Sequence, residues 1–173
     1  MVAKRIITTL MLKDGVLFRT KEFSPDYRYT LNFVDMWSVD ELIIIDISRN
    51  LNFYDKEKEI FFEEMKKISK NAYIPITAGG GVRKLKDIEK LLKNGADKII
   101  LNTASIIDVN IISLAAKEFG SQCIVVCVDT MLEKDQYYLM ENYGQKKSRI
   151  NLIDYIEKIQ EKNAGEIFLQ SVN

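Results

Sequence analysis

A glycine turn near the middle of the sequence limits the folds that are open to this chain. Ala78-Gly79-Gly80-Gly81-Val82-Arg83 follows the apolar segment Ile74-Pro75-Ile76, and a short charged helical pattern comes next. A second apolar run, Lys98–Leu101, then ends in Asn102-Thr103. Strand, glycine turn, helix and strand in this order form a βαβ unit, in which both strands point the same way. The chain is therefore predicted to contain a parallel sheet.

The same segment predicts a phosphate site at the carboxyl end of that sheet. Consecutive glycines let the backbone approach an anion closely and present free N–H donors, which we expect from Gly80 and Gly81. Asn102 and Thr103, at the end of the next strand, are expected to add polar contacts. Ligands bind at this edge of parallel α/β folds. The alternative is a glycine turn that only joins strand to helix.

Strand and helix patterns alternate along the whole sequence. The apolar runs that predict strands are Arg5–Met11, Leu42–Ile47, Ile74–Thr77, Lys98–Leu101, Cys123–Val128 and Glu166–Ser171. The helical patterns between them are clearest at Lys56–Ser69, Leu85–Leu92, Val109–Phe119 and Asn151–Lys162. Near-continuous apolar strands joined by helices are typical of a parallel sheet covered by helices. A doubly wound open sheet and a (β/α)8 barrel both fit this α/β pattern.

Polar residues within the strands favour the barrel. Thr9 and Met11 share one face of the first strand, and Cys127 and Asp129 share one face of the fifth. A barrel interior tolerates polar groups at its mouths, whereas a doubly covered open sheet seldom does. Residues 1–173 are therefore predicted to form a single TIM-type barrel domain. A closed barrel typically has about 250 residues, so we expect this one to be truncated after about six βα units, at its C-terminal end.

A weak internal sequence similarity also suggests a barrel of two related halves. Glu41–Ile47 resembles Glu166–Val172, and at a similar offset the first strand with Met11 matches the fifth strand with Asp129.

Composition excludes several classes of function. The sequence has 25 basic and 25 acidic residues, so no global field favours a nucleic acid or a membrane surface as partner. No apolar run approaches the about 20 residues of a membrane span, and the N-terminus lacks a signal-peptide pattern. Histidine is absent, which excludes histidine acid–base chemistry and histidine-ligated metal. We expect neither a metal nor a cofactor.

Cysteines and the longest charge run are expected to be structural. Cys123 and Cys127 would lie about 13 Å apart along one strand, too far to form a disulfide, which indicates a reduced, cytoplasmic setting. The charge run from Lys56 to Lys70 balances acids against bases and predicts a solvated helix face.

Short motifs from the first residue to the last belong together. They are Lys4–Ile7, Lys13–Gly15, Asp40–Leu42, Asp46-Ile47, Gly79–Val82, Gly95–Lys98, Asn102–Ala104, Phe119–Gln122, Val128-Asp129 and Gly165–Ile167. Together they resemble HisF, the cyclase subunit of imidazole glycerol phosphate synthase. HisF proteins are (β/α)8 barrels that take ammonia from a partner glutaminase, HisH. With it they split a phosphoribulosyl formimino aminoimidazole nucleotide into imidazole glycerol phosphate and an aminoimidazole ribotide.

The resemblance implies a subunit of histidine biosynthesis with a HisH-like glutaminase and a phosphorylated small molecule as partners. Asp129 becomes the counterpart of the family's general acid at the end of strand five. A carboxylate suits this ring closure because protons are delivered and removed around a nitrogen-rich intermediate. The alternative is a solvated carboxylate that caps the following loop. The substrate-binding residues that the resemblance implies are Gly80, Gly81, Asn102, Thr103, Asp46 and Arg19.

A second constellation lies near the amino ends of the predicted strands. Its members are Arg5, Glu41, Lys98 and Glu166. The resemblance implies that they form the gate through which ammonia enters from the glutaminase, with Asp97 on the same face as a partner contact. Physically, two cations and two anions form a self-compensating ring that could also be purely structural.

Three departures from the family pattern stand out. Met11 takes the place of the family's second catalytic aspartate, at the end of strand one. Arg19 and Thr20 take the places of a lysine and a glycine in the following loop. The sequence ends at Asn173, where the family has an aspartate and two more βα units with the second phosphate site.

Two alternative functions follow from these departures. Met11 and the run to Phe23 resemble a HisF-like branch encoded with surface-polysaccharide genes, whose members are thought to supply ammonia for the amidation of an amino sugar. A truncated, inactive barrel that serves as an assembly module is the other alternative, because unpaired strand edges invite another chain.

Overall fold

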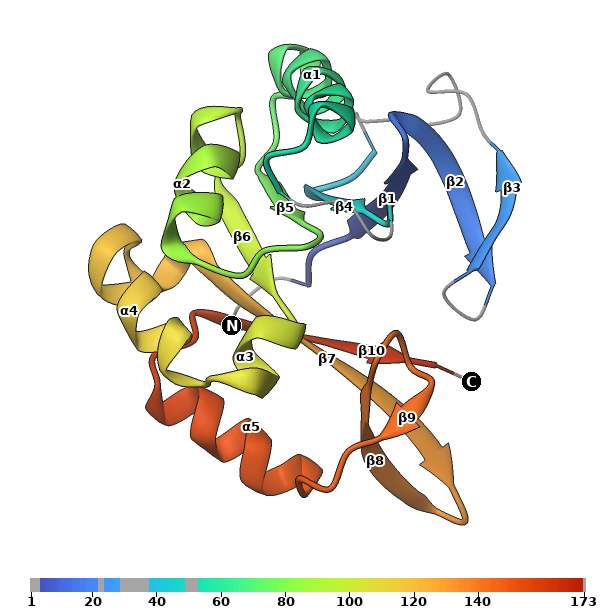
Figure 1. Cartoon of the computed structure of the whole chain (residues 1–173), viewed down its shortest axis with the longest axis vertical. Helices are drawn as coiled ribbons and strands as arrows, with labels where there is room; N and C mark the ends of the chain where they lie inside the picture. The colour runs from blue at the N-terminus through green and yellow to red at the C-terminus, as the bar shows by residue number, and fades with distance from the viewer. Residues whose placement is uncertain (1–3, 22–23, 29–37, 49–52, 173) are drawn as a thin grey trace. The chain divides into compact units, whose positions relative to one another are not determined.

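The computed structural model describes residues 4–21, 24–28, 38–48 and 53–172 (Figure 1). These residues form two compact units, each described separately below. The first unit holds the described residues up to Ile99, except Lys21, Ser24 and Arg83–Leu85, which group with the second unit. The second unit continues from Ile100. That residues 1–173 form one barrel domain stays a prediction.

The first unit is built around parallel strands. Its strands are β1 (Ile7–Lys13), β2 (Val16–Lys21), β3 (Ser24–Arg28), β4 (Glu41–Asp46) and β5 (Ile76–Gly79), in the order β3-β2-β1-β4-β5. β4 pairs in parallel with both β1 and β5. β1 and β2 form an antiparallel hairpin around Asp14-Gly15, whose φ angles of 52° and 74° favour an Asp-Gly pair.

Two helices belong to the first unit. They are α1 (Lys56–Asn71) and α2 (Leu85–Lys93), and β6 (Lys98–Leu101) begins at the end of this unit. Several apolar side chains of both helices and of β4 are almost fully buried; they include Leu42, Ile44, Phe61, Phe62, Met65, Ile88 and Leu91. A strand with nearly every residue buried is expected where helices cover a parallel sheet.

The second unit has a longer central strand. Its elements are α3 (Thr103–Ile107), α4 (Asn110–Phe119), η2 (Ser121–Cys123), β7 (Ile124–Glu133), β8 (Gln136–Glu141), β9 (Lys146–Lys147), α5 (Leu152–Glu161) and β10 (Glu166–Ser171). β7 pairs in parallel with β10 and then continues into an antiparallel hairpin with β8 (Figure 1).

The two units repeat one arrangement of strands. β1 runs parallel to β4 and ends in the hairpin with β2, just as β7 runs parallel to β10 and ends in the hairpin with β8. Ile7 lies opposite Glu41, and Val125 lies opposite Glu166. Counting along each strand from these pairs places Met11 in β1 and Asp129 in β7 at equivalent positions, which agrees with the internal sequence similarity.

The α/β class and the parallel strands are confirmed, and the architecture is compatible with a (β/α)8 barrel. All six predicted strands and all four predicted helices are present, and the bounds of β6 and β10 are those predicted. The strand β2 and the helix α3 were not predicted. Cys123 lies in η2 and not on the strand, and both cysteines are free. None of the helices in the described ranges has the length and apolar character needed to cross a lipid bilayer.

Candidate active site and charged ring

The predicted phosphate turn follows β5 directly. Gly80 and Gly81 have φ angles of 108° and 74°, a region that favours glycine. A Cβ on Gly80 would lie 2.2 Å from the backbone oxygen of Asp46, so the turn can approach the end of β4 only without a side chain. Within the described part of the chain, and apart from the two adjacent residues, a Cβ on Gly81 would have one heavy atom within 4 Å, the Nζ of Lys58 at 3.8 Å. The turn is therefore tight at Gly80 and open at Gly81.

Lys58 and Asp46 form a buried ion pair beside this turn. The Nζ of Lys58 lies 2.5 Å from Oδ2 of Asp46 and donates to the carbonyl oxygen of Gly80 at 3.0 Å. The other carboxylate oxygen of Asp46 accepts the backbone N–H of Ser48 at 2.9 Å. Asp46 thus holds a lysine, and its predicted contact with substrate stays a prediction.

Sequence reasoning missed Lys58 because it assigned the whole charge run of α1 to solvent. That expectation is wrong for this residue, which is only 4% exposed. The rings of Phe53 and Phe61 cover the ammonium, with centroids 5.1 and 5.0 Å from Nζ. Cation–π attraction and the ion pair together stabilise a charge that would otherwise be costly to bury.

Asp129 lies on β7, where pairing changes from β10 to the hairpin. Its carboxylate is buried and accepts hydrogen bonds from Nδ2 of Asn102 at 3.0 Å and from the thiol of Cys127 at 3.7 Å. Burial raises the pKa of Asp129, although these two hydrogen bonds oppose the shift. The group therefore keeps its proton to a higher pH than an ordinary aspartate, which suits a general acid.

Cys127 is held as a thiol. Burial raises the pKa of Cys127, and the neighbouring Asp129 carboxylate raises it further. Because the thiolate is the reactive form, a raised pKa agrees with the structural role expected for Cys127.

A buried chain of hydrogen bonds fixes the backbone at Asn102. The hydroxyl of Tyr155 donates to Ser105, which donates to the carbonyl oxygen of Asn102; the distances are 2.9 and 2.7 Å. Burial raises the pKa of Tyr155 to about 12, so it stays a donor. These contacts position the side-chain amide of Asn102 for its hydrogen bond to Asp129. Thr103 follows as the first residue of α3.

The structure describes the predicted phosphate residues in two groups. Gly80 and Gly81 belong to the first unit, and Asn102 and Thr103 belong to the second. Their joint grip on one phosphate stays a prediction. Arg19 lies on β2 with an exposed side chain, and its predicted contact with substrate also stays a prediction.

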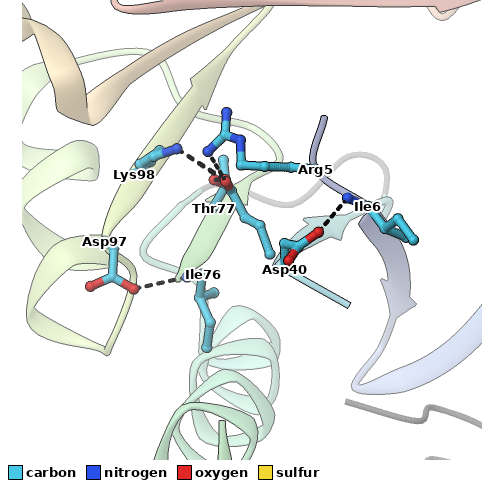
Figure 2. A network of polar contacts seen from close by, with 8 residues as sticks. Arg5, Ile6, Asp40, Ile76, Thr77, Asp97 and Lys98 are labelled. Atoms are coloured by element: carbon cyan, nitrogen blue, oxygen red, sulfur yellow. Dashed lines mark hydrogen bonds and ion pairs between the residues drawn. The ribbon is translucent and has the colours of Figure 1, made fainter. Parts of the chain in front are cut away.

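Three members of the predicted ring converge in the first unit (Figure 2). Glu41, the first residue of β4, is 2% exposed. Its carboxylate accepts hydrogen bonds from Nη1 of Arg5 at 2.9 Å and from Nζ of Lys98 at 3.1 and 3.2 Å. It also accepts the hydroxyl of Thr77 at 2.6 Å, a partner that sequence reasoning missed. Glu166 begins β10 in the second unit, so its place in the ring stays a prediction.

An aspartate immediately before each of two ring residues locks a neighbouring segment in register (Figure 2). The carboxylate of Asp40 accepts the N–H of Ile6 at 2.7 Å, and the N–H of Asp40 donates to the oxygen of Ile6 at 2.8 Å. Asp97 forms the same reciprocal pair with Ile76, at 2.8 and 2.7 Å. These clamps set the position of Glu41 and Lys98. The predicted contact of Asp97 with a partner stays a prediction.

Comparisons with known proteins agree with this architecture. A family model described as "Histidine biosynthesis protein" matches residues 4–173. The chain belongs to the histidine biosynthesis protein family. Three relatives are each named imidazole glycerol phosphate synthase subunit HisF, and all align over 100% of this chain. They come from Natranaerobius thermophilus (35% identical, 69% of its length), Exiguobacterium sp. (32%, 68%) and Sulfolobus acidocaldarius (32%, 70%).

Two departures from the HisF pattern contact one another. Met11 is partly buried on β1, and its thioether sulfur accepts the hydroxyl of Thr20 at 3.1 Å. Met11 holds the position in the first unit that Asp129 holds in the second. This family member therefore presents a carboxylate at only one of the two equivalent strand positions.

Proposed function

We propose that the protein is a HisF-type synthase subunit that uses ammonia from a glutaminase partner to form imidazole glycerol phosphate in histidine biosynthesis. The observation that carries the proposal is the buried Asp129 carboxyl, held by Asn102 at the strand position where the HisF resemblance predicts the general acid. The family match over residues 4–173 supports the same assignment.

Each group of site residues has a distinct part in the proposed reaction. Asp129, with its raised pKa, delivers and recovers protons at nitrogen atoms of the substrate. The open backbone at Gly81, together with Asn102 and Thr103, binds a substrate phosphate through N–H and side-chain donors. The charged ring around Glu41 admits ammonia at the amino ends of the strands.

Inorganic phosphate is a direct probe of the binding half of this proposal. In 1H–15N spectra of the labelled protein, we expect phosphate to shift the amide signals of Gly80 and Gly81 with about millimolar affinity. Asn102 and Thr103 should shift with the same Kd, because one site is proposed. Gly120 also has a positive φ but lies outside the site, so it serves as the internal reference. Static Gly80 and Gly81 signals throughout the titration would refute the phosphate site.

Glutaminase coupling tests the gate. Co-purified with a HisH-like glutaminase, the Lys98→Met variant is expected to stimulate glutamine hydrolysis about tenfold less than the unaltered protein. The variant removes one cation from the buried Glu41 carboxylate and so disturbs the ring. Lys93→Met is the matched control, since Lys93 is an exposed lysine on α2 paired only with Glu89 among the ion pairs of the described residues. Equal stimulation by both variants would leave the ring with a structural role alone.

Amidation of an amino sugar in surface-polysaccharide biosynthesis is the second candidate. Met11 favours this second candidate, because a thioether that accepts a hydrogen bond from Thr20 neither donates nor accepts a proton in ring closure. On this reading the protein passes ammonia to a different acceptor, and the ring retains its role. An inactive assembly module is the remaining alternative, and it predicts neither phosphate binding nor glutaminase stimulation.

A further inference from the structure

We propose that Lys58 is the fixed cation of the phosphate site at the Gly80-Gly81 turn. This inference rests on the proposed function, since it adds a charge to the same site. The ligand class is a phosphate monoester or inorganic phosphate, bound to the backbone at Gly81 on the side where the Lys58 ammonium lies.

The contacts of Lys58 fix its ammonium in one place. The Nζ atom is tied to the Asp46 carboxylate at 2.5 Å and to the Gly80 carbonyl at 3.0 Å, and two phenyl rings cover it. Its side chain is only 5% exposed. A lysine so constrained loses its rotamer freedom on folding and not on ligand binding, which is the condition for a preorganised site.

The open side of Gly81 faces this ammonium. Among the residues that the structure describes, excluding the two adjacent to Gly81, the Lys58 Nζ is the one heavy atom within 4 Å of a Cβ built on Gly81, at 3.8 Å. An anion that enters this space meets the cation of the ion pair, whereas the Asp46 carboxylate is engaged by Lys58 and by the N–H of Ser48. Solvent and salt screen a buried charge only weakly, and the nearby Asp46 carboxylate offsets part of its field, so the ammonium acts on an anion at short range, at the turn itself.

The charge of Lys58 can be separated from its structural contacts by a pair of substitutions. Lys58→Met keeps most of the side-chain volume and removes the charge. Asp46→Asn removes the opposing charge and keeps an acceptor oxygen. If the lysine acts on phosphate, Lys58→Met weakens the binding of inorganic phosphate about tenfold or more, whereas Asp46→Asn binds at least as tightly as the unaltered protein. If the pair only clamps the turn, both variants weaken binding alike.

The experiment is a phosphate titration of the full chain, followed by the Gly81 amide signal. Lys56→Met is the matched control, because Lys56 is an exposed lysine on the same helix, and it should leave the Kd unchanged. Lys58→Arg keeps the charge and should retain part of the affinity. The double variant Asp46→Asn/Lys58→Met buries no unpaired charge, so it provides the measurement if Lys58→Met does not fold.

The outcomes separate the two proposals. If the unaltered protein does not bind phosphate at Gly81, the phosphate site of the proposed function is wrong. If it binds, but Lys58→Met or the double variant binds equally well, only the role of Lys58 is overturned. A loss of affinity in Asp46→Asn as large as in Lys58→Met also overturns it.

Discussion

Replacing Asp129 by asparagine is expected to lower the turnover of imidazole glycerol phosphate formation about 10²–10⁴-fold, because the reaction loses its general acid. Asparagine keeps the acceptor for the Asn102 amide but cannot transfer a proton. Product formation with saturating ammonia measures the effect without the glutaminase. Asp135→Asn is the control, since Asp135 is an exposed turn residue with a positive φ that asparagine tolerates. Full turnover by Asp129→Asn would exclude Asp129 as the general acid.

The same variant should change the pH dependence of stability. The pKa of Asp129 is raised in the folded state, so the folded protein binds this proton more tightly than the unfolded chain does. Its contribution to stability is fully present below the ordinary aspartate pKa of about 3.9 and is lost as pH rises through the raised value. Asparagine does not ionise. The difference in stability between Asp129→Asn and the unaltered protein should therefore favour the variant more at pH 7 than at acidic pH. Thermal unfolding of both proteins at both pH values would show this.

Replacing Met11 by aspartate is expected to raise the rate of imidazole glycerol phosphate formation by as much as about 10²–10⁴-fold. The substitution places a second carboxylate at the strand position equivalent to that of Asp129. The hydroxyl of Thr20, which now donates to the Met11 sulfur, would donate to the new carboxylate. Met11→Leu is the matched control, because it removes the sulfur without adding a carboxylate, and it should leave the rate unchanged.

This substitution also separates the two candidate functions. Complementation of a cyclase-deficient strain by the protein with Met11 in place would favour the histidine pathway without any need for a second aspartate. Failure of both the unaltered protein and Met11→Asp to complement, with glutaminase stimulation intact, would favour amidation of an amino sugar.

The sequence was most informative where local chemistry alone determines the backbone. The left-handed conformations of Gly80 and Gly81 follow from a glycine run after an apolar strand, since only glycine adopts them at no steric cost. The bounds of β6 and β10 agree with those of the apolar runs that predicted them. The β1–β2 hairpin was missed, although Asp14-Gly15 carries the signal for its turn.

The sequence by itself also determined the family, because short motifs spread over the whole chain resemble HisF and the match extends over residues 4–173. The resemblance to HisF pointed to Asp129 as the general acid, which stays a prediction, and to a charged ring, of which Arg5 and Lys98 contact Glu41. The parallel strand order explains why the ring residues can meet, because parallel strands bring their amino ends to one edge of a sheet.

Only the tertiary structure decided which polar groups meet. Lys58 is an ordinary member of a helical charge run until Phe53 and Phe61 cover it and Asp46 receives its ammonium. Thr77 becomes a partner of Glu41 through the parallel pairing of β4 with β5. The pKa of Asp129 is raised because the fold buries its carboxyl, an effect of desolvation that no pattern of neighbours along the chain encodes.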